Sequence, residues 1–333
     1  MKKILALLLA LWIPAAVLSG CVPQDDSAAS NKLNIVTTIF PAYDWVREIL
    51  GDETDRAEIT TLLDSGVDLH SYQPTVDDIV KISECDLFLY VGGESDGWVE
   101  DALKNAPNKD RKVIRLLDVL GDSAKAEETV EGMQEEEHDH EEEGHGHEEE
   151  AEYDEHIWLS LKNAQVLVAA ISEALQKTDP ARKDTYAANA AAYVEKLSAL
   201  DGEYRAAVDS GKYKTLLFGD RFPFRYLADD YGLDYYAAFP GCSAETEASF
   251  ETVSFLAGKM DALGLPCVLT IEGTQHKIAE TVVQNTAQKN QQILTMDSMQ
   301  AVTANDAASG VSYLSIMEKN LSVLKKALGQ EAE

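Results

Sequence analysis

The chain has 333 residues and a formal net charge of −31 at pH 7, with 59 acidic residues against 28 basic ones. A charge of this sign and size argues against nucleic acid and anionic membrane surfaces as partners, and it is compatible with cations. The length is enough for two ordinary domains, and beyond the N-terminal segment no stretch is long and apolar enough to span a membrane.

Residues 1–20 have the pattern of a secretory signal peptide, because two lysines precede a short apolar run that ends in small residues. Leu18-Ser19-Gly20-Cys21 resembles a bacterial lipobox, which implies cleavage before Cys21 and a lipid on that cysteine. The alternative is an ordinary signal peptide with an incidental cysteine. Residues 21–32 are small and polar, and they are expected to form a lipidated flexible tether.

Strand and helix patterns alternate through residues 33–177, the predicted N-terminal lobe. Strand-like runs occupy 33–39, 58–63, 86–91 and 113–116. Helical spacing between them favours a mainly parallel sheet with helices on both faces. His70 lies in the loop between the second strand and the next helix, the kind of junction where open α/β sheets bind ligands.

An acidic, histidine-containing tract follows, in a loop predicted to be disordered over residues 123–153. Between residues 127 and 155 there are 16 acidic residues and no lysine or arginine, and such dense like charge prevents packing. The histidines within it are His138, His140, His145 and His147. Imidazole suits zinc, copper and nickel, so we interpret these histidines as an auxiliary, weakly binding set that collects metal. The alternative is a solubilising linker.

His156 follows this tract and precedes a helix-like segment, a setting similar to that of His70. We interpret His70 and His156 as two ligands of one buried metal site. The next segment, 178–211, is predicted to be a single linking helix that starts at Asp179-Pro180. The alternative is a pair of shorter helices broken near Gly202.

Residues 212–333 again alternate strand and helix patterns and form the predicted C-terminal lobe. Asp220 and Asp297 come directly after two of its strands, although each taken singly is more readily explained as a helix cap or a surface acid. Three cysteines remain after Cys21, so at most one disulfide can form. Of these three, Cys85 and Cys267 are expected to be small buried hydrophobic residues, and Cys242 lies in a loop.

Several motifs together resemble the solute-binding lipoproteins of bacterial zinc/manganese ABC transporters. They are Ile35-Val36-Thr37-Thr38 with Pro41, Val67-Asp68-Leu69-His70-Ser71-Tyr72-Gln73-Pro74, Asp154-Glu155-His156-Ile157-Trp158-Leu159, Tyr231-Gly232-Leu233, Glu245-Thr246-Glu247-Ala248-Ser249 and Leu294-Thr295-Met296-Asp297-Ser298. The resemblance implies an α/β fold of two similar lobes joined by one long helix, with metal in the cleft between them. It places ligands at His70, His156 and Asp297. The third ligand, a His or Glu in the family, falls on Asp220.

The resemblance also implies a function. The chain is expected to be a monomeric extracytoplasmic receptor, anchored to the outer face of the cell membrane by the lipid on Cys21. It would capture Zn²⁺ and deliver it to an ABC permease and its ATPase. Mn²⁺ is the alternative metal. A surface metallohydrolase is disfavoured because the His-x-x-x-His helix motif is absent and four protein ligands leave no position for water. An adhesin with the same fold remains open.

Overall fold

The computed structural model describes residues 32–104, 106–134, 152–243, 247–273 and 276–330. Its strands are β1 (Leu33–Thr37), β2 (Ala57–Thr61), β3 (Leu87–Tyr90), β4 (Lys112–Arg115), β5 (Thr215–Phe222), β6 (Asp234–Pro240), β7 (Cys267–Thr270) and β8 (Gln292–Thr295). Its α-helices are α1 (Phe40–Leu50), α2 (Val76–Glu84), α3 (Val99–Lys104), α4 (Leu116–Leu120), α5 (Leu161–Thr178), α6 (Lys183–Ser210), α7 (Arg225–Tyr231), α8 (Phe250–Leu263), α9 (Lys277–Asn285), α10 (Ala304–Ala308) and α11 (Tyr313–Ala327). Its short 3₁₀ helices are η1 (Gly51–Arg56), η2 (Leu69–Ser71), η3 (Glu94–Asp96), η4 (Gly121–Ser123), η5 (Ile157–Leu159) and η6 (Pro180–Arg182). Within the described ranges, no helix has the length and apolar character needed to cross a membrane.

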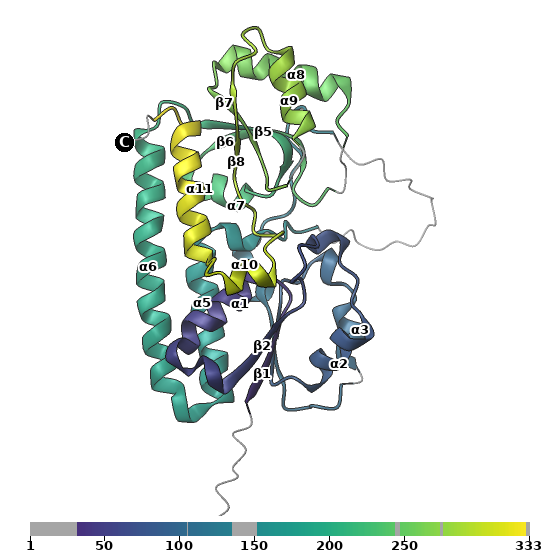
Figure 1. Cartoon of the computed structure of the whole chain (residues 1–333), viewed down its shortest axis with the longest axis vertical. Helices are drawn as coiled ribbons and strands as arrows, with labels where there is room; N and C mark the ends of the chain where they lie inside the picture. The colour runs from purple at the N-terminus through teal and green to yellow at the C-terminus, as the bar shows by residue number, and fades with distance from the viewer. Residues whose placement is uncertain (1–31, 105, 135–151, 244–246, 274–275, 331–333) are drawn as a thin grey trace, which may run out of the picture. The chain divides into compact units, whose positions relative to one another are not determined.

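The strands form two four-stranded parallel sheets, ordered β2-β1-β3-β4 and β6-β5-β7-β8 (Figure 1). The alternation of strand and helix in the sequence predicted this arrangement, and the fold class is confirmed. In the first sheet β3 is almost fully buried, which agrees with its uninterrupted run of apolar residues. The carboxyl ends of the strands lead into the loops that carry the candidate site residues.

In the second sheet β5 is longer than the sequence predicted. We expected the strand to end at Phe218, with Gly219 and Asp220 in a loop, but it continues to Phe222. Its register against β6 shifts between Phe218 and Arg221. Gly219 and Asp220 therefore form an irregularity within the strand and do not end it. Asp220 therefore lies within β5 rather than after it.

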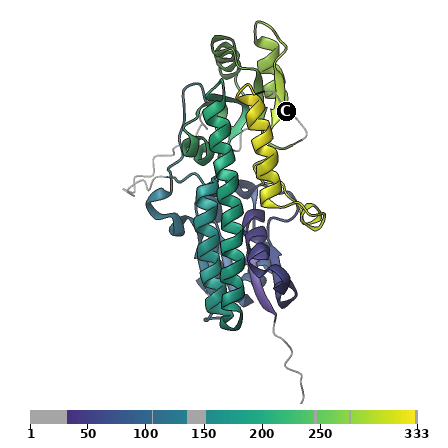
Figure 2. The ribbon, with the colours of Figure 1, turned by 90° about the vertical axis from the view of Figure 1, so that its left-hand side faces the viewer.

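The long helix α6 runs unbroken from Lys183 to Ser210, so the alternative of two shorter helices is wrong. Large apolar residues recur along it at spacings of three, four and seven, and all six are buried: Tyr186, Tyr193, Leu197, Leu200, Tyr204 and Val208. The helix packs against α5, α1 and α11, and Figure 2 shows α5, α6 and α11 running side by side.

One large hydrophobic core connects the two sheets beneath these helices. It contains residues of β1 and β3 as well as residues of β5, β7 and α11. Hydrogen bonds reinforce the connection: the Trp158 indole N–H donates to the Ser298 carbonyl at 2.9 Å, and the Tyr313 hydroxyl donates to the Trp158 carbonyl at 2.7 Å. A smaller cluster packs α8 and α9 onto the second sheet.

Candidate metal centre

His70 lies in η2, just after β2, in a turn that its neighbour Asp68 stabilises. The Asp68 carboxylate accepts the backbone N–H of His70 at 3.0 Å, which caps the short helix. The imidazole side chain is only 9% exposed. Its Nδ1 lies 2.9 Å from the Ser95 hydroxyl and 3.4 Å from a carboxylate oxygen of Glu155. These two oxygens favour a proton on Nδ1 and leave Nε2 with a free lone pair.

His156 is held in the same way by the acid two residues before it. The Asp154 carboxylate accepts the backbone N–H of His156 at 2.8 Å, and its Oδ1 lies 3.0 Å from the imidazole Nδ1. The side chain is fully buried. A carboxylate on one ring nitrogen fixes the tautomer and makes the other nitrogen a better metal ligand. His156 Nε2 is therefore the atom available for coordination.

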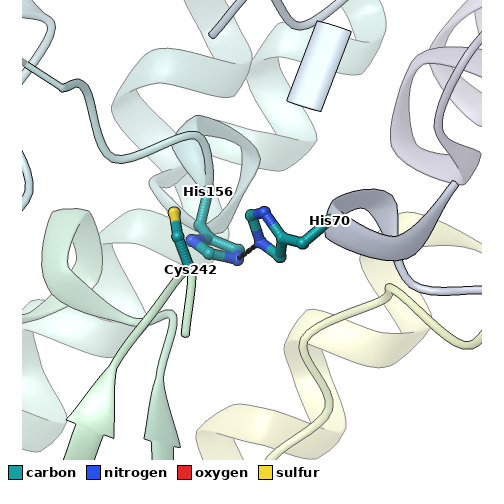
Figure 3. Close-up of side chains that lie close together, drawn as sticks. All are labelled: His70, His156 and Cys242. Carbon is teal, nitrogen blue, oxygen red and sulfur yellow. Dashed lines mark hydrogen bonds between the residues drawn. The ribbon is translucent and has the colours of Figure 1, made fainter. Parts of the chain in front are cut away.

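The two available nitrogens face each other at a separation of 3.2 Å, as Figure 3 shows. Two nitrogens bound to one tetrahedral zinc ion at about 2.05 Å lie about 3.3 Å apart. The pair therefore has the spacing of two ligands that share one ion. The segments that bring them together, η2 and the turn before η5, are 86 residues apart.

Electrostatics also favour a cation here. Burial lowers the pKa of His70 to about 3, and positive charge on His156 acts in the same direction. Burial also acts to lower the pKa of His156, but the charge of Asp154 and the hydrogen bond it accepts raise it above its usual value. Burial raises the pKa of Glu155 to about 7. At most one of the two imidazoles therefore carries a positive charge. A bound metal ion would take the place of that proton.

A third potential ligand is Cys242, in the loop after β6. One nitrogen from each histidine and the Cys242 sulfur all lie within 4.8 Å of one another. Burial raises the pKa of the Cys242 thiol, and the carboxylates of Asp154 and Glu127 raise it further. Nothing in the sequence pattern predicted Cys242 as a ligand. The sequence feature that could have pointed to a ligand here is the position of Cys242 directly after a strand, beside Gly241.

The two predicted carboxylate ligands, Asp220 and Asp297, both accept backbone hydrogen bonds. Asp220 accepts the backbone N–H of Arg221 at 2.9 Å and that of Ile271 at 3.3 Å. Asp297 accepts the backbone N–H of Met299 at 2.8 Å. Among the described residues, neither carboxylate belongs to the group of ligand atoms around His70 and His156.

A cavity of about 360 Å³ opens beside His70 and Cys242. Its walls are His70, Tyr72, Gln73, Glu94, Ser95, Trp98, Glu127, Glu152, Tyr153, Glu155 and Cys242. Four of these residues are glutamates, so the cavity attracts cations. Glu152 and Tyr153 belong to the C-terminal end of the loop 123–153. The four histidines of the acidic tract, like Cys21, lie outside the described residues.

Cys85, Cys242 and Cys267 are all unpaired, and Cys85 and Cys267 are buried as predicted. Cys85 donates to the Ile82 carbonyl at 3.2 Å, and Cys267 lies within the core. Of these three cysteines, Cys242 is therefore the one whose sulfur lies near imidazole nitrogens.

Comparison with known proteins places this geometry in context. A family model described as zinc-uptake complex component A, periplasmic, matches residues 35–327. The zinc-binding lipoprotein AdcA of Streptococcus pneumoniae serotype 4 is 34% identical over 331 residues, and the match covers 99% of this chain but only 62% of that relative's length. The high-affinity zinc uptake system protein ZnuA of Bacillus subtilis is 31% identical over 298 residues, covering 90% of this chain and 88% of that protein.

Solved structures agree with the sequence matches. The Zn(II)-bound ZnuA-like domain of Streptococcus pneumoniae AdcA superposes with a TM-score of 0.69 at 29% identity, and the match covers 90% of this chain and 100% of that domain. The similarity thus includes both sheets and the helix between them.

Proposed function

Because this chain belongs to the family of zinc-uptake complex component A, a family of metal-binding solute receptors, we propose that it captures zinc outside the cytoplasm and delivers it to an ABC permease. The observation that carries this proposal is the pair of imidazole Nε2 atoms 3.2 Å apart. Each ring has its other nitrogen held by an oxygen, as metal-binding histidines usually do. In this role the zinc ion is cargo, so its binding has to be tight and reversible.

Zinc is the better candidate of the two metals. Imidazole nitrogens suit zinc, whereas manganese prefers carboxylate, carbonyl and water oxygens. Asp220 and Asp297 are the further ligands that the family pattern predicts. In this structure one oxygen of each carboxylate accepts a backbone N–H, and a carboxylate bonded in this way still has lone pairs for a metal ion.

We further propose that the chain is a monomer without catalytic activity, that a lipid on Cys21 anchors it to the membrane, and that an ATPase drives the permease. Family membership supports the absence of catalysis, because no relative reported above is named as an enzyme. The name of the streptococcal relative, a lipoprotein, supports the anchor.

The acidic tract has an auxiliary role in this proposal. His138, His140, His145 and His147 would hold zinc weakly and raise its concentration near the receptor site. The described ends of the tract support this arrangement. The Glu127 N–H donates to the Glu152 carbonyl at 2.7 Å, and both glutamates line the cavity beside His70.

Isothermal titration with zinc tests the receptor site. We expect His70→Ala and His156→Ala each to weaken the tight site by more than about 100-fold, because the loss of second-shell partners alone typically costs 10–100-fold. His276→Ala is the matched control, since His276 occupies the N-cap position of α9 without a side-chain cap and does not belong to the group of ligand atoms around His70 and His156. Wild-type affinity in either of the first two variants would remove that histidine from the site and contradict the proposal.

A further inference from the structure

The loop after β6 supplies a third ligand type to the site. We propose that Cys242 binds the ion held by His70 and His156 through its thiolate, so that the centre contains two imidazoles and one sulfur. This inference rests on the receptor function proposed above. It assigns the third position, which the family pattern gave to Asp220 on β5, to the loop after the neighbouring strand β6 instead.

The distances fit a tetrahedral ion. With zinc–nitrogen bonds of about 2.05 Å and zinc–sulfur bonds of about 2.3 Å, a sulfur and a nitrogen on one tetrahedral ion lie about 3.6 Å apart. The Cys242 sulfur lies within 4.8 Å of one nitrogen of each imidazole. A movement of the sulfur by about 1 Å would bring it to this distance and add a third ligand to the two imidazoles. Figure 3 shows the sulfur beside the His156 ring.

The loop is shaped to approach His156 closely. A Cβ atom on Gly241 would lie 3.1 Å from two atoms of the His156 ring and 2.9 Å from the Phe222 carbonyl oxygen. Glycine at this position therefore lets the backbone pass against the Nδ1–Cε1 edge of the imidazole, which brings the next residue, Cys242, beside the ring.

Contacts on both sides of Cys242 hold it there. Its backbone N–H donates to a carboxylate oxygen of Glu127 at 2.9 Å. The carbonyl of the next residue, Ser243, accepts from the Arg221 guanidinium at 3.2 Å, and the same guanidinium lies 2.6 Å from the Asp68 carboxylate. Because Asp68 caps the turn of His70, one arginine connects the cysteine loop with the first histidine. Such outer-shell contacts are what orient ligands in metal sites.

A thiolate changes the selectivity of the receptor. Sulfur is a soft ligand that suits zinc, whereas manganese, magnesium and calcium prefer oxygen. Two neutral imidazoles and one thiolate also leave a dipositive ion with less excess charge than the imidazoles alone. The chain should therefore reject manganese more strongly than a site of imidazoles and carboxylates does.

Cobalt substitution tests for the sulfur bond directly. The full chain loaded with Co²⁺ should show a sulfur-to-cobalt charge-transfer band in the near ultraviolet, and Cys242→Ser should abolish this band. Cys267→Ser and Cys85→Ser should keep it, because neither of these buried sulfurs contacts an imidazole nitrogen. Loss of the ligand should also weaken zinc binding at least about tenfold, and Cys242→Asp should narrow the preference for zinc over manganese.

Alkylation provides a second measurement that needs no variant. Zinc should protect Cys242 from iodoacetamide in the wild-type chain, with the labelled cysteines identified by peptide mass spectrometry. Equal labelling with and without zinc would overturn the assignment of Cys242. So would an unchanged charge-transfer band or unchanged zinc affinity in Cys242→Ser.

The two proposals fail in distinguishable ways. If His70→Ala and His156→Ala lose zinc while Cys242→Ser matches the wild type, the receptor function stands and the thiolate ligand is wrong. If all three variants keep wild-type affinity, the proposed function falls as well.

Discussion

At the scale of single residues, Asp44 is a buried carboxyl group that makes stability depend on pH. It is 2% exposed and accepts the Tyr313 backbone N–H at 2.8 Å, and burial raises its pKa from 3.8 to about 6. Between these two values the folded state binds the proton and the unfolded state does not, so this contribution to stability falls as pH rises from 4 to 6. Asp44→Asn should therefore stabilise the fold at pH 7 by up to ~3 kcal/mol and change little at pH 4.

Urea denaturation at the two pH values measures this difference. Asp118→Asn is the matched control, because that side chain is 69% exposed. An equal effect of Asp44→Asn at pH 4 and pH 7 would show that its ionisation does not oppose folding.

The sequence could identify some site residues because their supporting groups are near in the chain. His70 and His156 each follow an aspartate by two residues, and in both cases that aspartate accepts the histidine's backbone N–H. This local pattern is visible in the sequence. Cys242 could not be identified in the same way, because its contact with the histidines depends on how β6 is placed beside the first lobe. That placement follows from packing across the core and not from neighbouring residues.

At the scale of elements, Gly202 is an exposed glycine in the middle of α6. A Cβ atom there would meet nothing within 4 Å, and the helix continues through it. Gly202→Ala should therefore raise the free energy of unfolding by about 0.5–1 kcal/mol, because alanine loses less backbone entropy in a helix. A rise in the midpoint of thermal unfolding, followed by circular dichroism, would measure it.

Gly232 is the matched control for this substitution. It also has open space around the Cβ position, but it ends α7 with a φ of 67°. Alanine is strained in that conformation, so Gly232→Ala should lower stability. Equal effects of the two substitutions would mean that backbone conformation does not decide their outcome.

The acidic tract can be removed without touching the described cavity. Deletion of residues 135–151 leaves Glu127 and Glu152, whose backbone hydrogen bond closes the base of the loop. We expect the deleted chain to bind fewer zinc ions while the tight site keeps its affinity, as judged by titration and by metal analysis after dialysis. Loss of the tight site would show that the tract takes part in it directly.

The helices and strands predicted from the sequence agree best with the structure where the pattern of apolar residues is continuous. The apolar spacing of α6 predicted one helix despite Gly202, and the apolar runs predicted the strands of both sheets. The predicted end of β5, at Phe218, was wrong because Gly219 and Asp220 have low strand propensity. At Gly219 a Cβ atom would come within 2.6 Å of the Ala279 backbone, so the glycine allows α9 to pack closely on the strand. Tertiary packing therefore extended a strand that its local sequence disfavours.

At the scale of the whole molecule, the shared core should limit movement between the two sheets. The largest hydrophobic cluster includes residues from both sheets, and Trp158 and Tyr313 form hydrogen bonds across it. Separating the sheets would expose this core and break those bonds. We expect the radius of gyration, measured by X-ray scattering, to be the same with and without zinc. A clear decrease on zinc binding would instead indicate closure about a hinge.

The ion pair between Arg221 and Asp68 has a consequence for how the cargo leaves. Arg221 belongs to β5, whereas Asp68 shapes the turn that carries His70. Under the proposed function, a permease that pulls on the second sheet would draw this turn with it and tilt the first imidazole away from the second. Release of zinc would then require only a local rotation of the turn that carries His70, without a rearrangement of the rest of the fold.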